Sequence, residues 1–547
     1  MSETHFDVII VGAGLSGIGA GYHLQKLCPT KSFVILESRS TIGGTWDLFK
    51  YPGIRSDSSM ETMGYTFKPW DGDRSISEGP KILQYIHTCA EEYDLKRRIR
   101  CGNAVTNANF DSSSSTWSLD VDISDGSSTS GSESTAPSAS PKGTRKSSRI
   151  AAASASGSGA SSPDTSPKSG SKAPRQTRYT CTFMLLCTGY YDYSEGYSPE
   201  FKGRNSFKGT IIHPQLWPEN FDYTGKRVVV IGSGATAITL VPSLTDKAAH
   251  VTMLQRSPSY IASVPGKDPV VHTMRVLLPR WMADIGARWW GVIFAVWAYW
   301  FSMAFPSAMK WALMKLAQKD LRKSDAYMNE HFSPRYGPWE QRLCVVPDAD
   351  FFHTIRDGKA TVVTSPVDRF CAKGVVLEKK SIDGEEVVLP ADVIVTATGL
   401  KLKLVGGISV SMDGKPVDFS HHVMYKGVMM SNVPNAAVSI GYTNNTWTLK
   451  CDLTFEYVTA LLNHMDRHGY RSVVPFKAPS KEDRAATSTG SDGECIFNLN
   501  AGYVLRSLNM MPRQGEEYPW VYHHNFLKDV VTLRYTHLLD DGVLQFK

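Results

Sequence analysis

The chain has 547 residues, which is too long for one ordinary hydrophobic core, so two or three domains are expected. Hydrophobic residues make up 42% and charged residues 20% of the sequence, a composition typical of folded globular proteins. The net charge of +6 arises from basic residues that are spread along the chain. This balance suits anionic cofactors and gives no reason to expect nucleic-acid binding.

The cysteines exclude several classes of protein. There are nine, at positions 28, 89, 101, 181, 187, 344, 371, 451 and 495. Their number is odd and no two have C-x-x-C spacing, which argues against a disulfide framework, a zinc site and a dithiol redox centre. The first residues run into an apolar strand without the features of a signal peptide. We therefore expect a cytoplasmic protein without a metal site.

A strand, a helix and a second strand are predicted in the first 40 residues. Residues 6–12 form a short apolar run, a helical stretch follows, and residues 32–37 are the second strand, which ends at Glu37. The turn before the helix has G-x-G-x-x-G spacing, formed by Gly12, Gly14 and Gly17. Such glycines let the backbone approach a pyrophosphate at a helix N-terminus, and the acid accepts hydrogen bonds from ribose hydroxyls. The pattern predicts a dinucleotide-binding unit.

A second unit of the same kind begins near residue 227. Its fingerprint has alanine in place of the third glycine and includes Gly232, Ser233, Gly234, Ala235 and Thr236. The next strand ends in Gln255, Arg256 and Ser257, and offers no carboxylate. A carboxylate would repel a 2′-phosphate, whereas an arginine can bind it with two hydrogen bonds. The second nucleotide is therefore predicted to be NADPH rather than NADH, with Arg256 and Ser257 at its phosphate.

Residues 123–177 contain mostly Ser, Ala, Gly, Thr, Pro and Lys. A segment of this composition cannot bury enough apolar surface to offset the entropy of ordering, so we predict that it is disordered. The flanking segments, 117–123 and 178–187, have the patterns of two hairpin strands. A long insertion is best tolerated at the tip of such a hairpin.

Residues 266–335 are predicted to be mainly helical. Within them, residues 289–309 carry no charged side chain and would span about 31 Å as one helix. Four tryptophans and one tyrosine crowd this run, at positions 289, 290, 297, 299 and 300. The alternatives are a buried or interfacial helix and a membrane span. We favour the first, with peripheral contact to a membrane surface as the expected form of membrane association.

Two dinucleotide sites in one chain indicate that electrons pass from NADPH to a bound flavin. Disulfide reductases need a closely spaced cysteine pair beside the flavin, and this sequence has none. Molecular oxygen is therefore the expected electron acceptor.

Two further motifs resemble those of one enzyme family. Residues 207–218, FKGTIIHPQLWP, are similar to the F-x-G-x-x-x-H-x-x-x-W-P fingerprint of type I Baeyer–Villiger monooxygenases, and residues 43–57 are similar to that family's longer fingerprint. The resemblance covers residues 5–112 and 178–545. The Ser-rich insertion and the apolar run at 289–309 depart from the family pattern.

The resemblance implies roles for individual residues. Arg342 corresponds to the catalytic arginine, and Asp57 to an acid that holds it, whereas Gln341 stands where many relatives have lysine. A fixed cation is chemically sensible, because oxygen transfer to a ketone develops negative charge in a dry site. His213 and Trp217 would be hinge or packing residues, and residues 441–450 would lie near the substrate. The remaining cofactor positions implied are Ser16, Thr45, Trp46, Asp47, Leu48, Arg55, Ser56 and Val105.

We therefore predict an α/β protein with two Rossmann-like dinucleotide-binding domains of the flavin-containing monooxygenase type and a helical insertion in the NADP domain. The expected parts are 1–111, 179–222 and 390–547 for the FAD domain and linker, 112–178 for the hairpin, and 223–389 for the NADP domain. The resemblance implies that FAD, NADPH and O₂ convert ketones to esters or lactones, with S-oxygenation of sulfides or thioamides as a further activity. Two alternatives are a mainly heteroatom-oxygenating enzyme and a membrane-associated flavoprotein that holds nucleotide only structurally.

Overall fold

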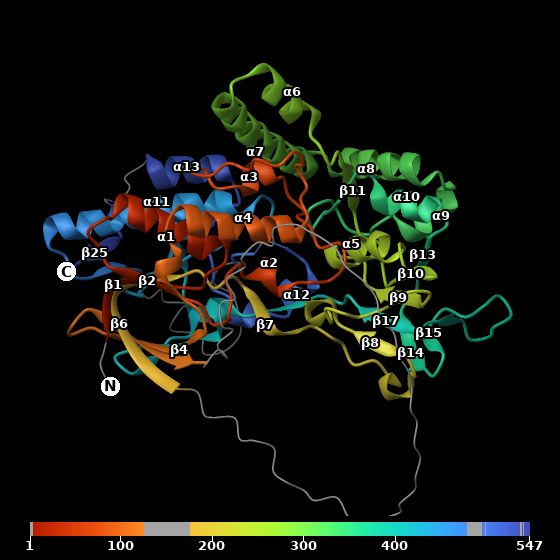
Figure 1. The fold of residues 1–547 in the computed structure, drawn as a ribbon, viewed down its shortest axis with the longest axis horizontal. Helices are drawn as coiled ribbons and strands as arrows, with labels where there is room; N and C mark the ends of the chain where they lie inside the picture. Colours follow the sequence, from red (N-terminus) through yellow and green to blue (C-terminus); the bar gives the residue numbers. More distant parts are fainter. Residues whose placement is uncertain (1–3, 125–174, 479–494, 498, 536–538, 540) are drawn as a thin grey trace, which may run out of the picture.

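The computed structural model describes residues 4–124, 175–478, 495–497, 499–535, 539 and 541–547. These residues contain two large sheets with helices packed against them (Figure 1). Most of the Ser-rich insertion, residues 125–174, lies outside the described residues.

The larger sheet has nine strands and draws on three separate parts of the chain. Its order is β20-β19-β4-β5-β6-β1-β2-β3, and β23 also pairs with β6. The strands are β1 (Thr4–Val11), β2 (Phe33–Leu36), β3 (Ile99–Arg100), β4 (Asn103–Asp111), β5 (Thr116–Ile123), β6 (Arg175–Leu186), β19 (Ser409–Met412), β20 (Lys415–Pro416) and β23 (Ala436–Val438). The pairing of β1 with β2 and β6 is parallel, as the continuous apolar run of β1 predicts. The expected discontinuity of this unit is therefore seen directly in its sheet.

The hairpin predicted on either side of the insertion is confirmed. β5 and β6 pair antiparallel from Trp117 opposite Cys181 to Ile123 opposite Arg175. Trp117 is fully buried, and its indole N–H donates to the carbonyl oxygen of Asn435 at 3.1 Å. The long insertion thus begins and ends at neighbouring positions on two paired strands.

The second sheet has five parallel strands in the order β13-β10-β9-β17-β8. They are β8 (Thr210–Ile212), β9 (Arg227–Ile231), β10 (His250–Gln255), β13 (Ala360–Thr364) and β17 (Val393–Thr396). The expected boundary at residue 389 places β17 in the wrong unit, since β17 lies between β9 and β8. The reason is that a short buried run such as Val393–Thr396 fits any parallel sheet, and its sequence does not identify its partners.

Helices cover the two sheets as Figure 1 shows, with α1, α4, α11 and α13 grouped over one face of the larger sheet and α5, α8, α9 and α10 beside the second. The helices are α1 (Leu15–Leu27), α2 (Thr45–Leu48), α3 (Met60–Met63), α4 (Gly79–Glu92), α5 (Ala235–Leu244), α6 (Pro269–Leu277), α7 (Arg280–Ala304), α8 (Pro306–Leu321), α9 (Asp325–His331), α10 (Asp350–Arg356), α11 (Trp447–His468), α12 (Gly502–Leu505) and α13 (Phe526–Arg534). Residues 266–335 are therefore mainly helical, as predicted.

Short sheets complete the structure. They are formed by β7 (Tyr191–Gly196) with β18 (Leu400–Leu402), β11 (Ile261–Val264) with β12 (Cys344–Pro347), β14 (Val367–Cys371) with β15 (Gly374–Leu377) and β16 (Val388–Pro390), β21 (Met424–Tyr425) with β22 (Met429–Met430), and β24 (Val473–Pro475) with β25 (Leu544–Phe546).

The apolar run at 289–309 is not one helix. α7 ends at Ala304, α8 begins at Pro306, and the two axes differ in direction by 114°. Proline lacks the N–H that would continue the first helix and is well suited to the first turn of the next. Among the described residues no single helix is long and apolar enough to cross a bilayer, whereas the bent pair meets that test by length and composition only.

Candidate active site

The first glycine fingerprint lies between β1 and α1, where glycine is required at two positions. Gly12 has φ +102°, and a Cβ there would lie 2.6 Å from the carbonyl oxygen of Cys187. A Cβ on Gly17 would lie 1.8 Å from the carbonyl oxygen of Gly12. No side chain caps α1, so its first backbone N–H groups remain open to a phosphate.

A cavity of about 180 Å³ lies against this fingerprint. Gly12, Gly14, Glu37 and Val105 all line it. The Glu37 carboxylate is buried and accepts a hydrogen bond from the backbone N–H of Ala13 at 2.8 Å, which fixes the acid beside the glycine turn. The cavity, the glycine turn and the acid form a site whose shape and chemistry fit the nucleotide part of FAD.

The other residues implied for this cofactor surround the same turn without lining the 180 Å³ cavity. Ser16 Oγ accepts from the indole N–H of Trp447 at 2.7 Å, and Thr45 Oγ1 lies 3.1 Å from the Tyr193 hydroxyl. Asp47 pairs with Arg39, their closest atoms being 2.5 Å apart. Trp46 packs against the core beneath α1, and Leu48 ends α2.

The second fingerprint lies between β9 and α5. Gly232 has φ +140°, and a Cβ there would lie 2.2 Å from the carbonyl oxygen of Ala397. The Ser233 hydroxyl donates to the carbonyl oxygen of Ser257 at 3.2 Å, so the turn and the end of β10 are tied together. No side chain caps α5 at Gly234, and Ala235 and Thr236 form its first turn. Arg256 follows β10 and is exposed, so its guanidinium is accessible to a bound nucleotide.

The loop at 51–58 connects the two units. The Tyr51 hydroxyl is hydrogen-bonded to Thr236, and a Cβ on Gly53 would lie 1.8 Å from the Ser243 hydroxyl of α5. Arg55 forms a two-point ion pair with Asp350 at the start of α10. The Ser56 hydroxyl accepts from the backbone N–H of Ser77 at 3.0 Å. The loop is therefore fixed on both sides.

Arg342 and Asp57 meet at this junction. Arg342 Nη2 lies 2.7 Å from Asp57 Oδ2, although the two residues come from distant parts of the sequence. The Asp57 carboxylate raises the pKa of Arg342 above its usual range, so the guanidinium is permanently charged. The two side chains are 36% and 32% exposed, and both are therefore accessible to a bound molecule. The two predicted catalytic residues are thus brought together.

Three tyrosines that the sequence motifs do not predict lie around Arg342, namely Tyr190, Tyr191 and Tyr503. Burial raises the pKa of Tyr503 to about 12 even though Arg342 opposes the shift, so its hydroxyl is neutral at physiological pH. Tyr190 and Tyr191 directly follow the strand-end turn Thr188–Gly189, a position that could have identified them. Nothing in the local sequence of Tyr503 points to this site.

His213 lies on the segment between the two units and has the geometry of a packing residue. Its Nδ1 accepts from the backbone N–H of Gln215, so its Nε2 carries the proton and donates to the carbonyl oxygen of Gly399 at 3.2 Å. Burial lowers the pKa of His213, which keeps the ring neutral. A Cβ on Gly196 would lie 1.9 Å from His213 Cε1, and Trp217 is buried against Tyr223.

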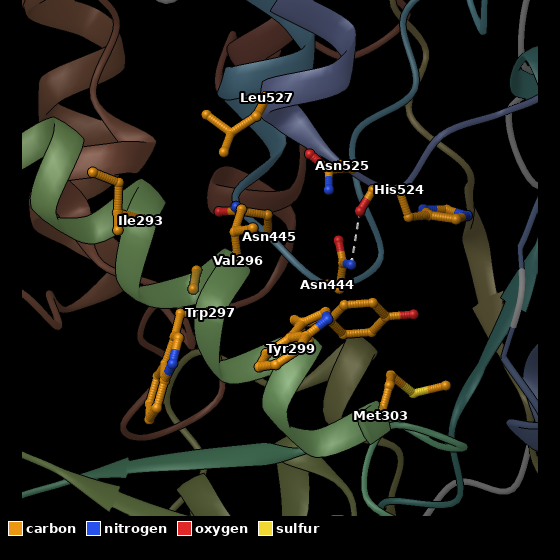
Figure 2. Close-up of a pocket in the computed structure, with 12 residues that line it drawn as sticks. Ile293, Val296, Trp297, Tyr299, Met303, Asn444, Asn445, His524, Asn525 and Leu527 are labelled. Carbon is orange, nitrogen blue, oxygen red and sulfur yellow. Dashed lines mark hydrogen bonds between the residues drawn. The ribbon is translucent and has the colours of Figure 1, made fainter. Parts of the chain in front are cut away.

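A second cavity, of about 400 Å³, lies between α7 and the segments before α11 and α13. Figure 2 shows α7 along one side and Asn444, Asn445, His524 and Asn525 across from it. The Asn444 amide donates to the carbonyl oxygen of His524 at 2.9 Å. Burial lowers the pKa of His524 to about 4, so this wall is polar but uncharged. The cavity therefore combines an aromatic and aliphatic side with a narrow strip of neutral polar groups.

Contacts link this cavity to the Arg342 segment and to the first glycine fingerprint. Tyr299 of α7 packs edge-on against Trp339, with ring centroids 5.5 Å apart, and Trp339 precedes Arg342 by three residues. On the opposite side, Trp447 directly follows the 444–446 wall and donates to Ser16 of the first fingerprint. The 400 Å³ cavity thus lies between the arginine segment and the glycine turn of the larger unit.

Two family models match parts of this chain, and known flavoproteins are similar to it along its whole length. Residues 171–285 match the family model for flavin-binding monooxygenase-like proteins, and residues 10–71 match that for an NAD(P)-binding Rossmann-like domain. The chain is 42% identical over 543 residues to the FAD-containing monooxygenase EthA of Mycolicibacterium smegmatis, covering 99% of this chain and 97% of the relative. It is 41% identical over 547 residues to the probable FAD-binding monooxygenase AlmA of Acinetobacter baylyi, covering 100% of this chain and 96% of the relative.

The chain belongs to the FAD-containing monooxygenases. The monooxygenase also has the fold of solved Baeyer–Villiger enzymes. A steroid monooxygenase bound to NADP matches with a TM-score of 0.68 and 19% identity over 99% of both chains. Cyclohexanone monooxygenase matches with a TM-score of 0.66 and 18% identity over 100% of both chains.

The predicted fold class and cofactors are confirmed by these relationships. The monooxygenase uses FAD and NADPH, and its substrates include O₂ and a small organic molecule. The alternative in which the nucleotides are only structural is therefore not retained. The Rossmann-like family model covers the first predicted unit, at residues 10–71, and the steroid monooxygenase shares the fold over 99% of the chain.

Proposed function

We propose that the monooxygenase is a Baeyer–Villiger enzyme that inserts one oxygen atom from O₂ into ketones to give esters or lactones. The observation that carries the proposal is the ion pair between Arg342 and Asp57, which holds an accessible cation where the two units meet. The Trp217-Pro218 ending of the linker motif also supports it, as do structural relatives named for cyclohexanone and for steroids.

In this proposal each residue acts through charge or position. Bound FAD, once reduced by NADPH, supplies the activation of O₂. Arg342 stabilises the negative charge that develops on the substrate carbonyl oxygen. Asp57 holds the guanidinium group of Arg342 in the orientation that this stabilisation requires. Arg55 and Ser56, which are fixed by Asp350 and Ser77, hold the loop that carries Asp57.

The cofactor positions follow the two sheets. We assign FAD to the nine-stranded unit, with its pyrophosphate at the Gly12–Gly17 turn, its ribose at Glu37, and residues 45–48 and Val105 around it. NADPH is assigned to the five-stranded unit at the Gly232–Thr236 turn. Arg256 and Ser257 lie at the end of β10, where they would bind the 2′-phosphate.

Replacing Arg256 by alanine tests the NADPH assignment. We expect kcat/KM for NADPH to fall by a factor equivalent to about 1.5–3 kcal/mol, because a charge-assisted pair to the 2′-phosphate is lost. The value for NADH should change little, since NADH lacks that phosphate. Steady-state kinetics with both nucleotides is the measurement, and Arg204→Ala, at another exposed arginine, is the control. Equal losses for the two nucleotides would contradict the assignment.

Oxygenation of sulfides or thioamides is the second candidate, because the same activated oxygen reacts with soft heteroatoms. A mixture of a ketone and a thioether, supplied together with NADPH and ¹⁸O₂, distinguishes the two. We expect a labelled ester as the main product, with less labelled sulfoxide. Sulfoxide alone, from enzyme that remains yellow and oxidises NADPH, would show that heteroatom oxygenation is the main activity.

We also propose that the 400 Å³ cavity receives the substrate, since Asn444 and Asn445 line it and belong to the segment 441–450 that is expected near the substrate.

Peripheral membrane contact through residues 289–309 is a further proposal, and a cytoplasmic location remains a prediction. The contact is supported by Trp289, Trp297 and Trp300, which are 42%, 51% and 58% exposed. α7 supplies these side chains, with α8 turning away after Phe305.

A further inference from the structure

Helix α7 has an unusual distribution of side chains for a helix that packs on a protein core. Its buried residues are Ala283, Ala287, Val292 and Ser302, which are small or polar apart from Val292, and a Cβ on Gly291 would lie 2.7 Å from Thr62 Cγ2. Arg288 also points inward, where it donates to the carbonyl oxygen of Gly64 at 2.6 Å and lies 3.1 Å from the Asp452 carboxylate. The helix is therefore attached through small residues and a buried ion pair.

Most of the large apolar side chains of α7 are exposed instead. Of the 28 exposed large hydrophobic residues in the described part of the chain, 15 lie between Val276 and Leu316. They include all five tryptophans in that exposed set, namely Trp281, Trp289, Trp297, Trp300 and Trp311. We name the exposed apolar side chains between Val276 and Leu316 the 276–316 face. Figure 1 shows α6 and the beginning of α7 extending beyond the other helices. So many exposed apolar side chains on neighbouring, projecting helices indicate a binding surface.

The charges around this face fit anionic lipid. Residues 269–324 contain eight Lys or Arg and two Asp or Glu. Lys315 and Lys319 follow Trp311 at four-residue spacing and are exposed, so tryptophan and cations share one side of α8. Tryptophan favours the level of the lipid headgroups, and cations near it are attracted to anionic lipids. A second copy of this chain would instead bring two cationic surfaces together.

The cavity opens at the same surface. Ile293, Trp297, Trp300 and Met303 belong to the 276–316 face and also line the 400 Å³ cavity. An apolar molecule dissolved in lipid would therefore reach the cavity without crossing water.

We propose that the 276–316 face docks on the surface of an anionic lipid membrane and that the cavity takes apolar carbonyl substrates directly from the lipid. The uptake of substrate rests on the proposed ketone oxygenation, whereas docking does not. The face is amphipathic and lies along the membrane plane, in keeping with the sharp turn between α7 and α8.

Flotation of the FAD-loaded enzyme with vesicles tests docking without turnover. We expect binding to vesicles of phosphatidylcholine mixed with phosphatidylglycerol, weaker binding to phosphatidylcholine alone, and weakening by salt. Trp281→Gln/Trp311→Gln removes two tryptophans that do not line the cavity, and should lower vesicle affinity roughly tenfold or more. Ile382→Gln/Phe476→Gln removes two exposed apolar side chains elsewhere and should bind as the parent does.

Three results would overturn docking. The first is that yellow, active enzyme does not float with either kind of vesicle. The second is that the Trp281/Trp311 variant binds vesicles as tightly as the parent does. The third is that analytical ultracentrifugation finds a dimer of the parent that the Trp281/Trp311 variant cannot form, which would make the 276–316 face an interface between two copies of the chain. Uptake is tested by comparing a long-chain ketone in vesicles with a short ketone in water. The Trp281/Trp311 variant should lose rate only on the vesicle-borne ketone. Equal rates of parent and variant on both the vesicle-borne and the water-soluble ketone would overturn uptake. If the parent bound vesicles but oxidised no ketone, the proposed function would be overturned instead.

Discussion

Replacing Arg342 by alanine is expected to abolish ester formation while leaving FAD binding and NADPH oxidation in place. Hydride transfer between bound nucleotides does not require this cation, whereas transfer of oxygen to a carbonyl group develops negative charge beside it. Removing a preorganised positive group from such a site costs about 3–4 kcal/mol, or roughly a hundredfold to a thousandfold in rate. The electrons should appear as hydrogen peroxide, so the ratio of peroxide to ester is the measurement.

Two further variants sharpen this test. Arg342→Lys should restore little ester formation, because an ammonium group does not reproduce the planar guanidinium that Asp57 orients. Asp57→Ala should give a milder form of the same defect. Arg369→Ala, which removes an exposed arginine of another ion pair, serves as the control for charge alone. Ester formation by Arg342→Ala at the parental rate would place the oxygen-transfer site elsewhere.

Replacing Asp529 by alanine is expected to be among the most destabilising single changes in the protein. Asp529 of α13 pairs with Lys450 of α11 at 2.8 Å, and the two side chains are 4% and 1% exposed. The Tyr442 hydroxyl also donates to Asp529, at 2.6 Å. Removing the carboxylate leaves a buried ammonium group without its counter-charge, which typically costs about 3–5 kcal/mol. The free energy of unfolding from urea denaturation is the measurement.

Comparison with other variants separates loss of the charge pair from loss of packing. Lys450→Met/Asp529→Leu removes both charges and should retain most of the stability, because neither partner is left buried alone. Asp466→Ala breaks the Lys31–Asp466 pair, whose aspartate is 49% exposed, and should cost about 0–1 kcal/mol. If Asp529→Ala were as stable as Asp466→Ala, the buried pair would contribute little to holding α13 on α11.

The sequence predicted those parts of the fold that depend on neighbours along the chain. The turns at Gly12 and Gly232 are examples, because a strand, a glycine turn and a helix are contiguous and only glycine fits the backbone. The partner sheet of Val393–Thr396 could not be predicted, since strand pairing is a long-range choice. The break before Pro306 has a local signal in the proline itself, but the uncharged run on both sides of it favours one continuous helix, and only the structure shows the turn.

In the candidate site, too, the sequence predicts individual residues from local motifs but not the long-range contacts between them. Arg342 and Asp57 were predicted from motifs, and their 2.7 Å contact follows from the fold. Tyr503 was not predicted, because it reaches Arg342 from a short helix near the end of the chain. The outward orientation of the tryptophans in α7 also required the structure, since the sequence shows that they cluster but not which side of the helix is attached.

The interleaving of the two sheets along the chain has a consequence for synthesis on the ribosome. The five-stranded sheet has all of its strands once residue 396 has emerged. The nine-stranded sheet begins with residue 4 but lacks β23 until residue 438, and α11, which packs on α1, continues to residue 468. Domains form as units during translation once their parts are available. The five-stranded unit begins later in the chain but can therefore fold first. The N-terminal strands of the nine-stranded unit stay incompletely covered until β23 and α11, in the last third of the protein, have been synthesised.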